Sequence, residues 1–304
     1  MIKKVQLHFS NDSHRGPGKV VRNLSEGLKA LGLMEDASFG RQAFHGFLQY
    51  PTEEEVIAPI TRGHASIHDY LFGPNLTVLP SEIAPAMVKY IQNMVVPSEW
   101  VRLLYRRFMM LDSTRIDVWP VGIDTDSWLP SDRGIRSVGP ITEPLRCLVY
   151  YKNRTQADLE AVIKMLTQYN ITAKVLRYGS YEEAELRSAC DWAHFGVLLT
   201  NTESQGIAYM EMLSTDLPLF VFNYPWWDYD GQYQRVKATS VPYFDSRCGA
   251  VTEKFDKVLF EEFLDKVVRW KYSPRSYILE NHTLKQAAQK YYDIMLRNSQ
   301  YGDA

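Results

Sequence analysis

The sequence predicts an α/β protein with two parallel β-sheets. Short apolar runs alternate with segments whose apolar residues recur at helical spacing, and this alternation extends over most of the chain. Gly and Pro interrupt it between residues 124 and 144, where no period is sustained. Because alternating strands and helices form parallel sheets through right-handed crossovers, we expect one sheet on each side of the interruption.

The first half contains four short apolar runs that are expected to be strands. They are Lys4–Phe9, Ala43–Gln49, Asn93–Val96 and Ile116–Val121. The apolar residues between Val20 and Leu31 have the spacing of one helix face, so a helix is expected after the first strand. Ser98 is a favourable N-cap residue directly before a second helix, which carries Trp100 and Leu104 on its apolar face.

The second half shows the same alternation of strand and helix segments. Strands are expected at Arg146–Tyr151, Ala173–Tyr178, Phe195–Leu199 and Leu219–Phe222. Helices are expected at residues 159–166, 182–189, 208–213, 260–270 and 277–296. We therefore expect domains over residues 1–128 and 145–276, with a linker over 129–144. The final segment, 277–304, is expected to form a helix that crosses back to the first domain.

Charge and composition exclude several classes of protein. Lys and Arg total 34 against 36 Asp and Glu, and a net charge of −2 argues against a strongly basic nucleic-acid-binding protein. The three cysteines (147, 190 and 248) have no CxxC spacing, so neither a disulfide framework nor a metal site is predicted. No apolar run approaches the roughly 20 residues of a membrane span, and the first run is a strand rather than a signal peptide. We expect a cytoplasmic protein, soluble or peripheral at a membrane.

Two glycines, Gly16 and Gly18, lie in the loop between the first strand and the first helix. Glycines at such a position allow backbone amides to approach an anion, which the helix dipole also attracts. The loop matches neither GxGxxG nor the P-loop pattern. On the residues alone, a structural turn is the better explanation.

The segment Thr202–Glu211 follows an expected strand and opens an expected helix. It places Glu203 in the loop and Glu211 inside the helix, with backbone amides between them. Carboxylates accept hydrogen bonds from sugar hydroxyls, and amides at a helix start bind phosphate, so the segment suits a ligand that carries both groups. Spacing alone favours a simpler reading, in which one carboxylate caps the helix and the other is solvated.

The same segment resembles the E-x7-E region of glycosyltransferase family 4, whose members have the GT-B fold. Further segments resemble motifs of that family in the same order along the chain: Arg15–Gly18, Val96–Trp100, Val121–Asp126 and Cys248–Val251. The resemblance implies two facing Rossmann-like domains with an interdomain cleft. It also implies a hexosyl or pentosyl transferase that retains the anomeric configuration and needs no metal or other cofactor.

The resemblance assigns roles to residues of the E-x7-E segment. It implies that Glu203 contacts the hydroxyls of the donor sugar and that Glu211 holds the donor ribose. The backbone near the diphosphate and the sugar would come from Ser204, Gln205, Gly206 and Ile207. In the first half, the glycine loop with Gly16 and Gly18 would contact the donor.

Three further assignments follow from the family. It places an Arg and a Lys, usually five residues apart, after the first strand of the second domain, whereas Lys152 and Arg154 are two apart here. Fixed cations there would stabilise the departing nucleoside diphosphate. The turn with Tyr178 and Gly179 would lie near the nucleotide base. His64, His68 and Asp69 are the candidates from the first half for a catalytic residue beside the anomeric carbon, although a lone histidine is more often structural.

The donor is expected to be a UDP- or GDP-sugar. The acceptor is expected to be a hydroxyl of a glycan, a lipid-linked molecule or another compound, with nucleic acid as the less favoured alternative. A catalytically silent nucleotide-sugar-binding or scaffold protein and a GT-B-related epimerase are the alternative functions. The sequence does not predict the oligomeric state.

Overall fold

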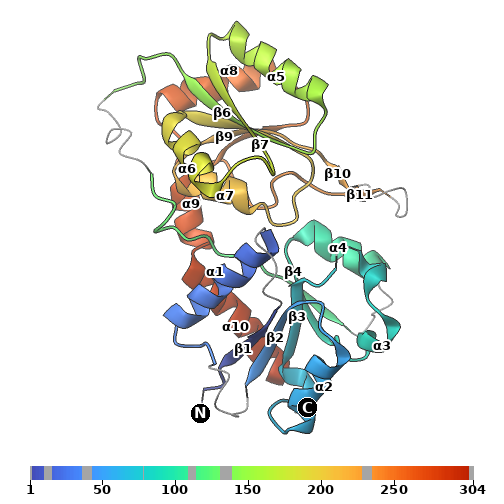
Figure 1. The fold of residues 1–304 in the computed structure, drawn as a ribbon. Helices are drawn as coiled ribbons and strands as arrows, with labels where there is room; N and C mark the ends of the chain where they lie inside the picture. Colours follow the sequence, from blue (N-terminus) through green and yellow to red (C-terminus); the bar gives the residue numbers. More distant parts are fainter. Residues whose placement is uncertain are drawn as a thin grey trace. The chain divides into compact units, whose positions relative to one another are not determined.

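The computed structural model describes residues 2–9, 16–35, 43–77, 79–108, 114–130, 139–227 and 235–300. Contacts divide the chain into two compact units, which are described separately. Unit 1 comprises residues 1–122 and 282–304, and unit 2 comprises residues 123–281. Each unit contains a five-stranded parallel sheet with helices on both faces (Figure 1), which confirms the predicted α/β class with two parallel sheets.

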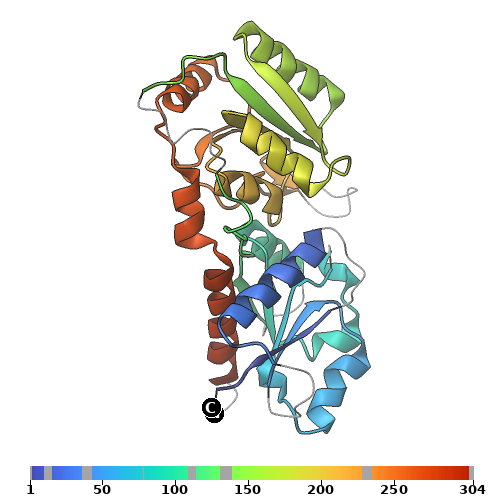
Figure 2. The same cartoon turned by 60° about the vertical axis from the view of Figure 1, so that its left-hand side comes forward.

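The sheet of unit 1 has the strand order β1-β2-β3-β4-β5. Its strands are β1 (Val5–His8), β2 (Phe44–Gln49), β3 (Tyr70–Asn75), β4 (Asn93–Val96) and β5 (Arg115–Val118). Its α-helices are α1 (Gly16–Ala30), α2 (Glu53–Thr61), α3 (Pro85–Val88), α4 (Glu99–Phe108) and α10 (Leu284–Gln300). Helices α1 and α10 lie side by side on one face of the sheet (Figures 1 and 2).

Close backbone contacts hold α10 in unit 1. A Cβ atom on Gly27 of α1 would lie only 2.4 Å from the carbonyl oxygen of Leu284, so the two helices pack more closely than any larger residue allows. The indole Nε1 of Trp119 donates to the carbonyl of Ala287 over 2.8 Å. The last helix is therefore part of the core of unit 1, although the rest of the unit precedes residue 123.

The sheet of unit 2 has the strand order β12-β9-β8-β6-β7. Its strands are β6 (Arg146–Lys152), β7 (Thr172–Arg177), β8 (Phe195–Thr200), β9 (Leu219–Phe222) and β12 (Gly249–Thr252), and β10 (Trp226–Trp227) pairs with β11 (Val236–Lys237). The helices are α5 (Gln156–Gln168), α6 (Glu183–Trp192), α7 (Ile207–Ser214), α8 (Lys257–Val268) and α9 (Pro274–Asn281). Apolar residues of α5 and α8 form one core with β6, β8 and β9.

Elements that differ from the sequence expectations include β3, β12 and the last helix. Strand β3 was not expected, because Gly73-Pro74 within it has the composition of a turn. Strand β12 lies where the sequence indicated only a glycine turn. The final helix is two helices, α9 and α10, because Thr283 and Gln286 form reciprocal hydrogen bonds that start a new helix.

The contact-based units change at residues 122/123 and 281/282, whereas the sequence placed a linker at 129–144 and the second boundary at 276/277. Gly122 belongs to unit 1 because its backbone packs against Leu284. Residues 125–128 belong to unit 2 because Arg275 donates to the carbonyls of Thr125 and Trp128 over 3.1 and 2.9 Å. Residues 131–138 of the expected linker lie outside the described residues.

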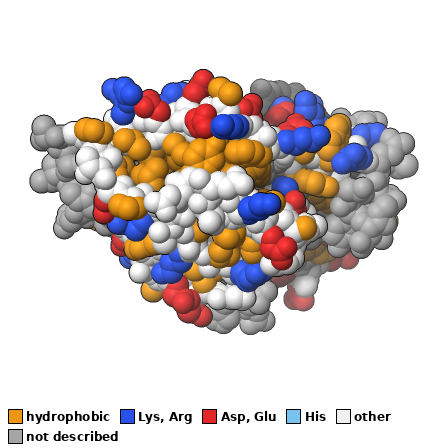
Figure 3. Space-filling model, turned by 90° about the horizontal axis from the view of Figure 1, so that it is seen from above, with side chains coloured by type: hydrophobic (Ala, Val, Ile, Leu, Met, Phe, Trp, Pro, Cys, Tyr) orange, Lys and Arg blue, Asp and Glu red, His pale blue; other side chains and the backbone are white. Residues whose placement is uncertain are grey.

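The surface carries apolar and charged side chains together. Figure 3 shows a face on which hydrophobic side chains form bands between Lys, Arg, Asp and Glu. Exposed apolar side chains of unit 2 include Val251, Phe255 and Val258. Mixed surfaces of this kind are ordinary in folded proteins and do not by themselves mark a binding site. Within the described ranges, no helix has the length and apolar character needed to cross a membrane.

A buried histidine makes the stability of unit 1 depend on pH. His45 on β2 is 1% exposed, and its Nδ1 lies 2.8 Å from Nε2 of His8. Burial lowers the pKa of His45 to about 3, and repulsion from His8, His64 and Lys3 adds to the effect. His45 is therefore neutral in the folded protein at neutral and mildly acidic pH.

Lowering the pH from 7.5 to 5 is expected to cost unit 1 about 2 kcal/mol through His45. The unfolded chain gains a proton near the ordinary pKa of 6.5 while the folded chain does not, so stability is lost as the pH falls from 6.5 toward the folded value. Chemical denaturation at both pH values should show this loss in the wild type and not in His45→Phe, whose ring suits the aromatic neighbours Phe47 and Tyr70. Equal pH dependence in both proteins would contradict the prediction.

Candidate active site

The carboxyl-terminal edge of the sheet in unit 2 brings together three loops. Strands β6 and β8 are neighbours, with Lys152 in register with Thr200, and β9 pairs with β8 on its other side. All three strands are parallel, so the residues that follow Lys152, Thr200 and Phe222 emerge at the same edge. This is the edge at which doubly wound sheets bind ligands.

Lys152 and Glu203 form an ion pair at this edge. The Nζ atom of Lys152 lies 2.8 Å from Oε1 and 2.9 Å from Oε2 of Glu203. The side chains are 21% and 11% exposed, so the pair is largely removed from solvent. The backbone amide of Glu203 donates to the carbonyl of Thr239 over 3.0 Å, which fixes the loop that carries the carboxylate. Both residues were sequence candidates, and the structure brings them together.

Burial changes the acidity of Glu203. It raises the pKa of the carboxyl group above its usual value, whereas the nearby charge of Lys152 lowers that pKa. Glu203 also adds to the elevation of the pKa of Tyr150 on β6, which is caused mainly by burial. A carboxylate held by one cation in such a place has little water around it, so a hydroxyl donor of a ligand would be a strong partner.

The loop after Glu203 ends at a left-handed residue that starts α7. Gly206 has φ +75° and is the N-cap of the helix. Gln205 and Gly206 are buried, Ser204 is exposed, and Ile207 is half-buried. The first turn of α7 contains no acidic side chain, so its amide groups form a region of positive potential. The predicted segment therefore has a geometry compatible with anion binding.

Gly206→Ala is expected to destabilise unit 2 by about 2–5 kcal/mol. The left-handed φ disfavours alanine, and the new Cβ would lie 1.9 Å from Cε1 of Tyr209, a buried ring. Gly179→Ala is the matched control, because Gly179 has φ +82° but nothing within 4 Å of an added Cβ. Thermal denaturation should show a much larger fall in Tm for Gly206→Ala. Equal losses in the two variants would contradict the close contact with Tyr209.

Glu211 lies inside α7 and is 3% exposed. It is not on a solvated helix face, which was the simpler sequence interpretation. Burial raises the pKa of Tyr181 to about 12, and the charge of Glu211 adds to this effect, so the two side chains interact electrostatically. The hydroxyl of Tyr181 donates to that of Tyr150 over 3.1 Å. Glu211 therefore belongs to a mostly buried polar region beside β6.

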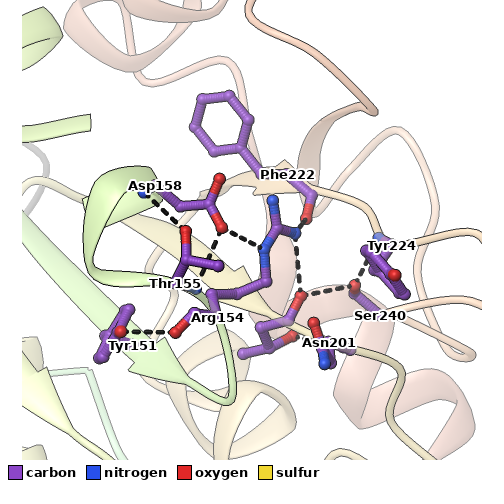
Figure 4. Close-up of polar contacts among 9 residues, drawn as sticks. Tyr151, Arg154, Thr155, Asp158, Asn201, Phe222, Tyr224 and Ser240 are labelled. Carbon is purple, nitrogen blue, oxygen red and sulfur yellow. Dashed lines mark hydrogen bonds and ion pairs between the residues drawn. The ribbon is translucent and has the colours of Figure 1, made fainter. Parts of the chain in front are cut away.

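The side chain of Arg154 bonds to Asp158 and to two strand carbonyls, whereas that of Lys152 bonds to Glu203. Its Nε donates to Oδ2 of Asp158 over 3.2 Å, and one terminal nitrogen donates to the carbonyls of Thr200 and Phe222, each over 3.4 Å (Figure 4). The guanidinium also lies 5.5 Å from the centre of the Tyr224 ring. The two candidate cations thus have different surroundings.

Tyr178 and Gly179 follow β7 at the same edge. The ring of Tyr178 is 46% exposed and lies 4.4 Å from Nζ of Lys152, within cation–π range. Gly179 is exposed and has φ +82°, which explains the glycine in this turn. The structure therefore places an accessible aromatic ring beside the Lys152–Glu203 pair.

The glycine-loop candidates belong to unit 1. Gly16 and Gly18 lie in the first turn of α1, where Gly16 is exposed and an added Cβ would meet nothing within 4 Å. Residues 10–15, which complete the loop, lie outside the described residues. No crowding therefore requires glycine at position 16.

His64 and Asp69 lie at the amino-terminal edge of the sheet of unit 1. Asp69 immediately precedes β3, accepts the backbone N–H of Ser66 over 3.1 Å, and lies 2.5 Å from Nζ of Lys3. The carbonyl of His64 accepts from the amide of Ala43, directly before β2. Both residues are thus at the amino-terminal ends of strands, whereas ligands of doubly wound sheets bind at the carboxyl ends. This position favours a structural role, and neither residue enters the function proposed below.

The hydrogen bonds that hold the 239–240 segment, to which the amide of Glu203 is bonded, were not predicted from the sequence. Oδ1 of Asn223 accepts from the hydroxyl of Thr239 and the amide of Ser240, each over 2.8 Å. The hydroxyl of Ser240 donates to the carbonyl of Thr200 over 3.2 Å. Nothing in the spacing of these residues signals a role, because they meet only through the fold. Among the described residues, no three His, Cys, Asp or Glu side chains gather as a metal site.

Comparisons with known proteins identify the fold. No protein-family model matches the sequence, and no curated protein sequence is similar to it. The structure is similar to a sucrose-phosphate synthase from Thermosynechococcus elongatus, with 11% identity, a TM-score of 0.52 and 99% of each chain covered. It is also similar to the catalytic domain of starch synthase IV from Arabidopsis thaliana, solved with ADP and acarbose. That match has 11% identity and a TM-score of 0.51, and it covers 96% of this chain and 80% of the other.

Both proteins are GT-B glycosyltransferases. This chain has the GT-B fold. The predicted fold is confirmed, and each of the two units corresponds to a Rossmann-like arrangement of parallel strands and helices. At 11% identity the likeness establishes the fold alone, so the reaction has to be argued from the residues of the site.

Proposed function

We propose that this protein is a retaining glycosyltransferase that moves a sugar from a nucleotide-sugar donor to an acceptor hydroxyl. The observation that carries the proposal is the shielded Lys152–Glu203 ion pair at the carboxyl-terminal edge of a GT-B sheet, beside the start of α7. The fold neighbours and the resemblance to glycosyltransferase family 4 support the reaction class. The donor is proposed to be a UDP- or GDP-sugar.

Each part of the donor has a partner of suitable chemistry. Lys152 and the amides at the start of α7 would bind the diphosphate, because both present positive charge to the same edge. Glu203 would accept hydrogen bonds from the sugar hydroxyls. Glu211 is proposed to hold the ribose, and the exposed ring of Tyr178 would stack on the base.

The proposed reaction breaks the bond between the anomeric carbon and the diphosphate oxygen. The electron pair of that bond passes to the nucleoside diphosphate, whose growing negative charge Lys152 and the α7 amides would stabilise. The acceptor oxygen forms the new bond on the same face of the sugar, and its proton passes to a diphosphate oxygen. The charge stabilisation comes from a lysine and backbone amides, and we therefore propose a reaction that requires no metal ion.

A thermal-shift screen against a panel of nucleotide sugars tests the proposal. A donor that binds the folded protein should raise its Tm, and the same donor should be slowly hydrolysed when no acceptor is added. Binding without any turnover would favour the scaffold alternative, and conversion to a stereoisomer of the nucleotide sugar would favour an epimerase. No shift with any nucleotide or nucleotide sugar would contradict the proposal.

A further inference from the structure

Arg154 joins the ends of three strands. It follows β6, and its guanidinium donates to the last carbonyls of β8 and β9, at Thr200 and Phe222. Asp158 accepts from its Nε, and the hydroxyl of Tyr151 donates to its carbonyl over 2.5 Å, so both ends of the residue are held (Figure 4). The Arg154 side chain is 14% exposed. Its hydrogen bonds and its low exposure are those of a residue with a structural role.

A path of three hydrogen bonds and one peptide bond leads from Arg154 to Glu203. The carbonyl of Thr200 accepts from Arg154 and also from the hydroxyl of Ser240, which is fully buried. The hydroxyl of Ser240 in turn accepts the amide of Tyr224 over 2.9 Å (Figure 4). The residue before Ser240 is Thr239, whose carbonyl accepts the amide of Glu203. Arg154 and Ser240 therefore meet at the carbonyl of Thr200, and Glu203 is bonded to the residue next to Ser240.

We propose that Arg154 is a positioning residue that holds Glu203 in place through Thr200 and the 239–240 segment, and that it does not bind the donor diphosphate. This inference rests on the proposed function for the role of Glu203. Guanidinium suits this position because its planar array of donors reaches the carboxylate of Asp158 and two carbonyls at once. Lysine cannot supply that geometry, so Lys152 and Arg154 are not interchangeable.

Arg154→Lys separates positioning from diphosphate binding, since it keeps the charge and loses the planar donors. We expect kcat for the donor to fall about 10-fold or more, because a small displacement of Glu203 affects the transition state. The affinities for UDP, GDP and ADP measured by calorimetry should stay within about twofold, and KM should change little. Arg269→Lys is the matched control, because Arg269 makes the same type of contact with an Asp four residues away on an exposed helix. A loss of nucleotide affinity in Arg154→Lys as large as that in Lys152→Met would overturn the inference.

Ser240→Ala interrupts the same path without touching any cation. We expect it to lower kcat with unchanged nucleotide affinity. The double variant Arg154→Lys/Ser240→Ala should be no slower than the slower single variant, because both changes act on one path. Fully additive losses in a double-mutant cycle would overturn the proposed path.

Hydrogen exchange at the amide of Glu203 gives a readout that does not depend on activity. This amide donates to Thr239, so its exchange should be faster in Arg154→Lys and in Ser240→Ala than in the wild type and in Arg269→Lys. Unchanged exchange in both variants overturns the positioning role, whatever the reaction. A wild-type protein that binds no nucleotide but shows faster exchange in both variants would contradict the proposed function while supporting the path to Glu203.

Discussion

Lys152→Met is expected to reduce turnover of the nucleotide-sugar donor by about 100-fold or more, the usual effect of removing one group that stabilises charge in a transition state. The variant loses the cation that faces the departing diphosphate, and it leaves the carboxylate of Glu203 in a shielded position without its ion pair. Binding of the bare nucleoside diphosphate should also weaken, by about 1.5–3 kcal/mol for a hydrogen bond to a charged group. Steady-state kinetics and calorimetry with UDP or GDP would measure both effects.

Lys174→Met is the control for this variant. Lys174 is exposed on the neighbouring strand β7, so its replacement removes the same charge from the same sheet at a distance from Glu203. It should leave turnover and nucleotide affinity unchanged. If the two methionine variants behave alike, Lys152 is a surface cation with no role in the reaction.

Glu203→Gln is expected to lower turnover by about 100-fold while leaving the affinity for the bare nucleoside diphosphate nearly unchanged. Glutamine keeps the shape of the side chain, but it replaces a charged acceptor with a weaker neutral one. The proposed partner of Glu203 is the sugar, which the bare nucleotide lacks. Comparing kcat for the donor with the dissociation constant of the nucleotide would separate the two effects.

Glu253→Gln provides the matched control, since Glu253 is exposed after β12. It should behave like the wild type in both measurements. If Glu203→Gln is fully active with a donor that binds, the proposed role of Glu203 is wrong. The scaffold alternative would then be favoured, because the ion pair would serve stability alone.

The fold was largely predictable because its signals are local. Strands β4 and β9 were predicted to the residue, and β6 and β8 were predicted to within one residue, since each is a short apolar run. Strand β3 was missed because Gly73 and Pro74, which normally mark a turn, lie within it. Its pairing with β2 and β4 outweighs that local preference.

The candidate site was predictable only in part. Glu203 and Lys152 stood out because each follows a strand in a pattern that resembles a known family, but their ion pair depends on two strands meeting in the sheet. The contacts of Arg154 could not be predicted, because the carbonyls that it binds carry no sequence signal. His64 and Asp69 were chosen by residue type, and the fold places them at the amino-terminal edge of the sheet.

The central claim is that the Lys152–Glu203 pair binds the donor of a retaining glycosyl transfer. Proton NMR of the sugar released from UDP-glucose or GDP-mannose, recorded before mutarotation, tests it most directly. Both donors are α-linked, so the account predicts that the wild type releases the α-anomer from the donor it accepts, and that Lys152→Met releases it far more slowly. Release of the β-anomer, or equal rates in the two proteins, would contradict the account.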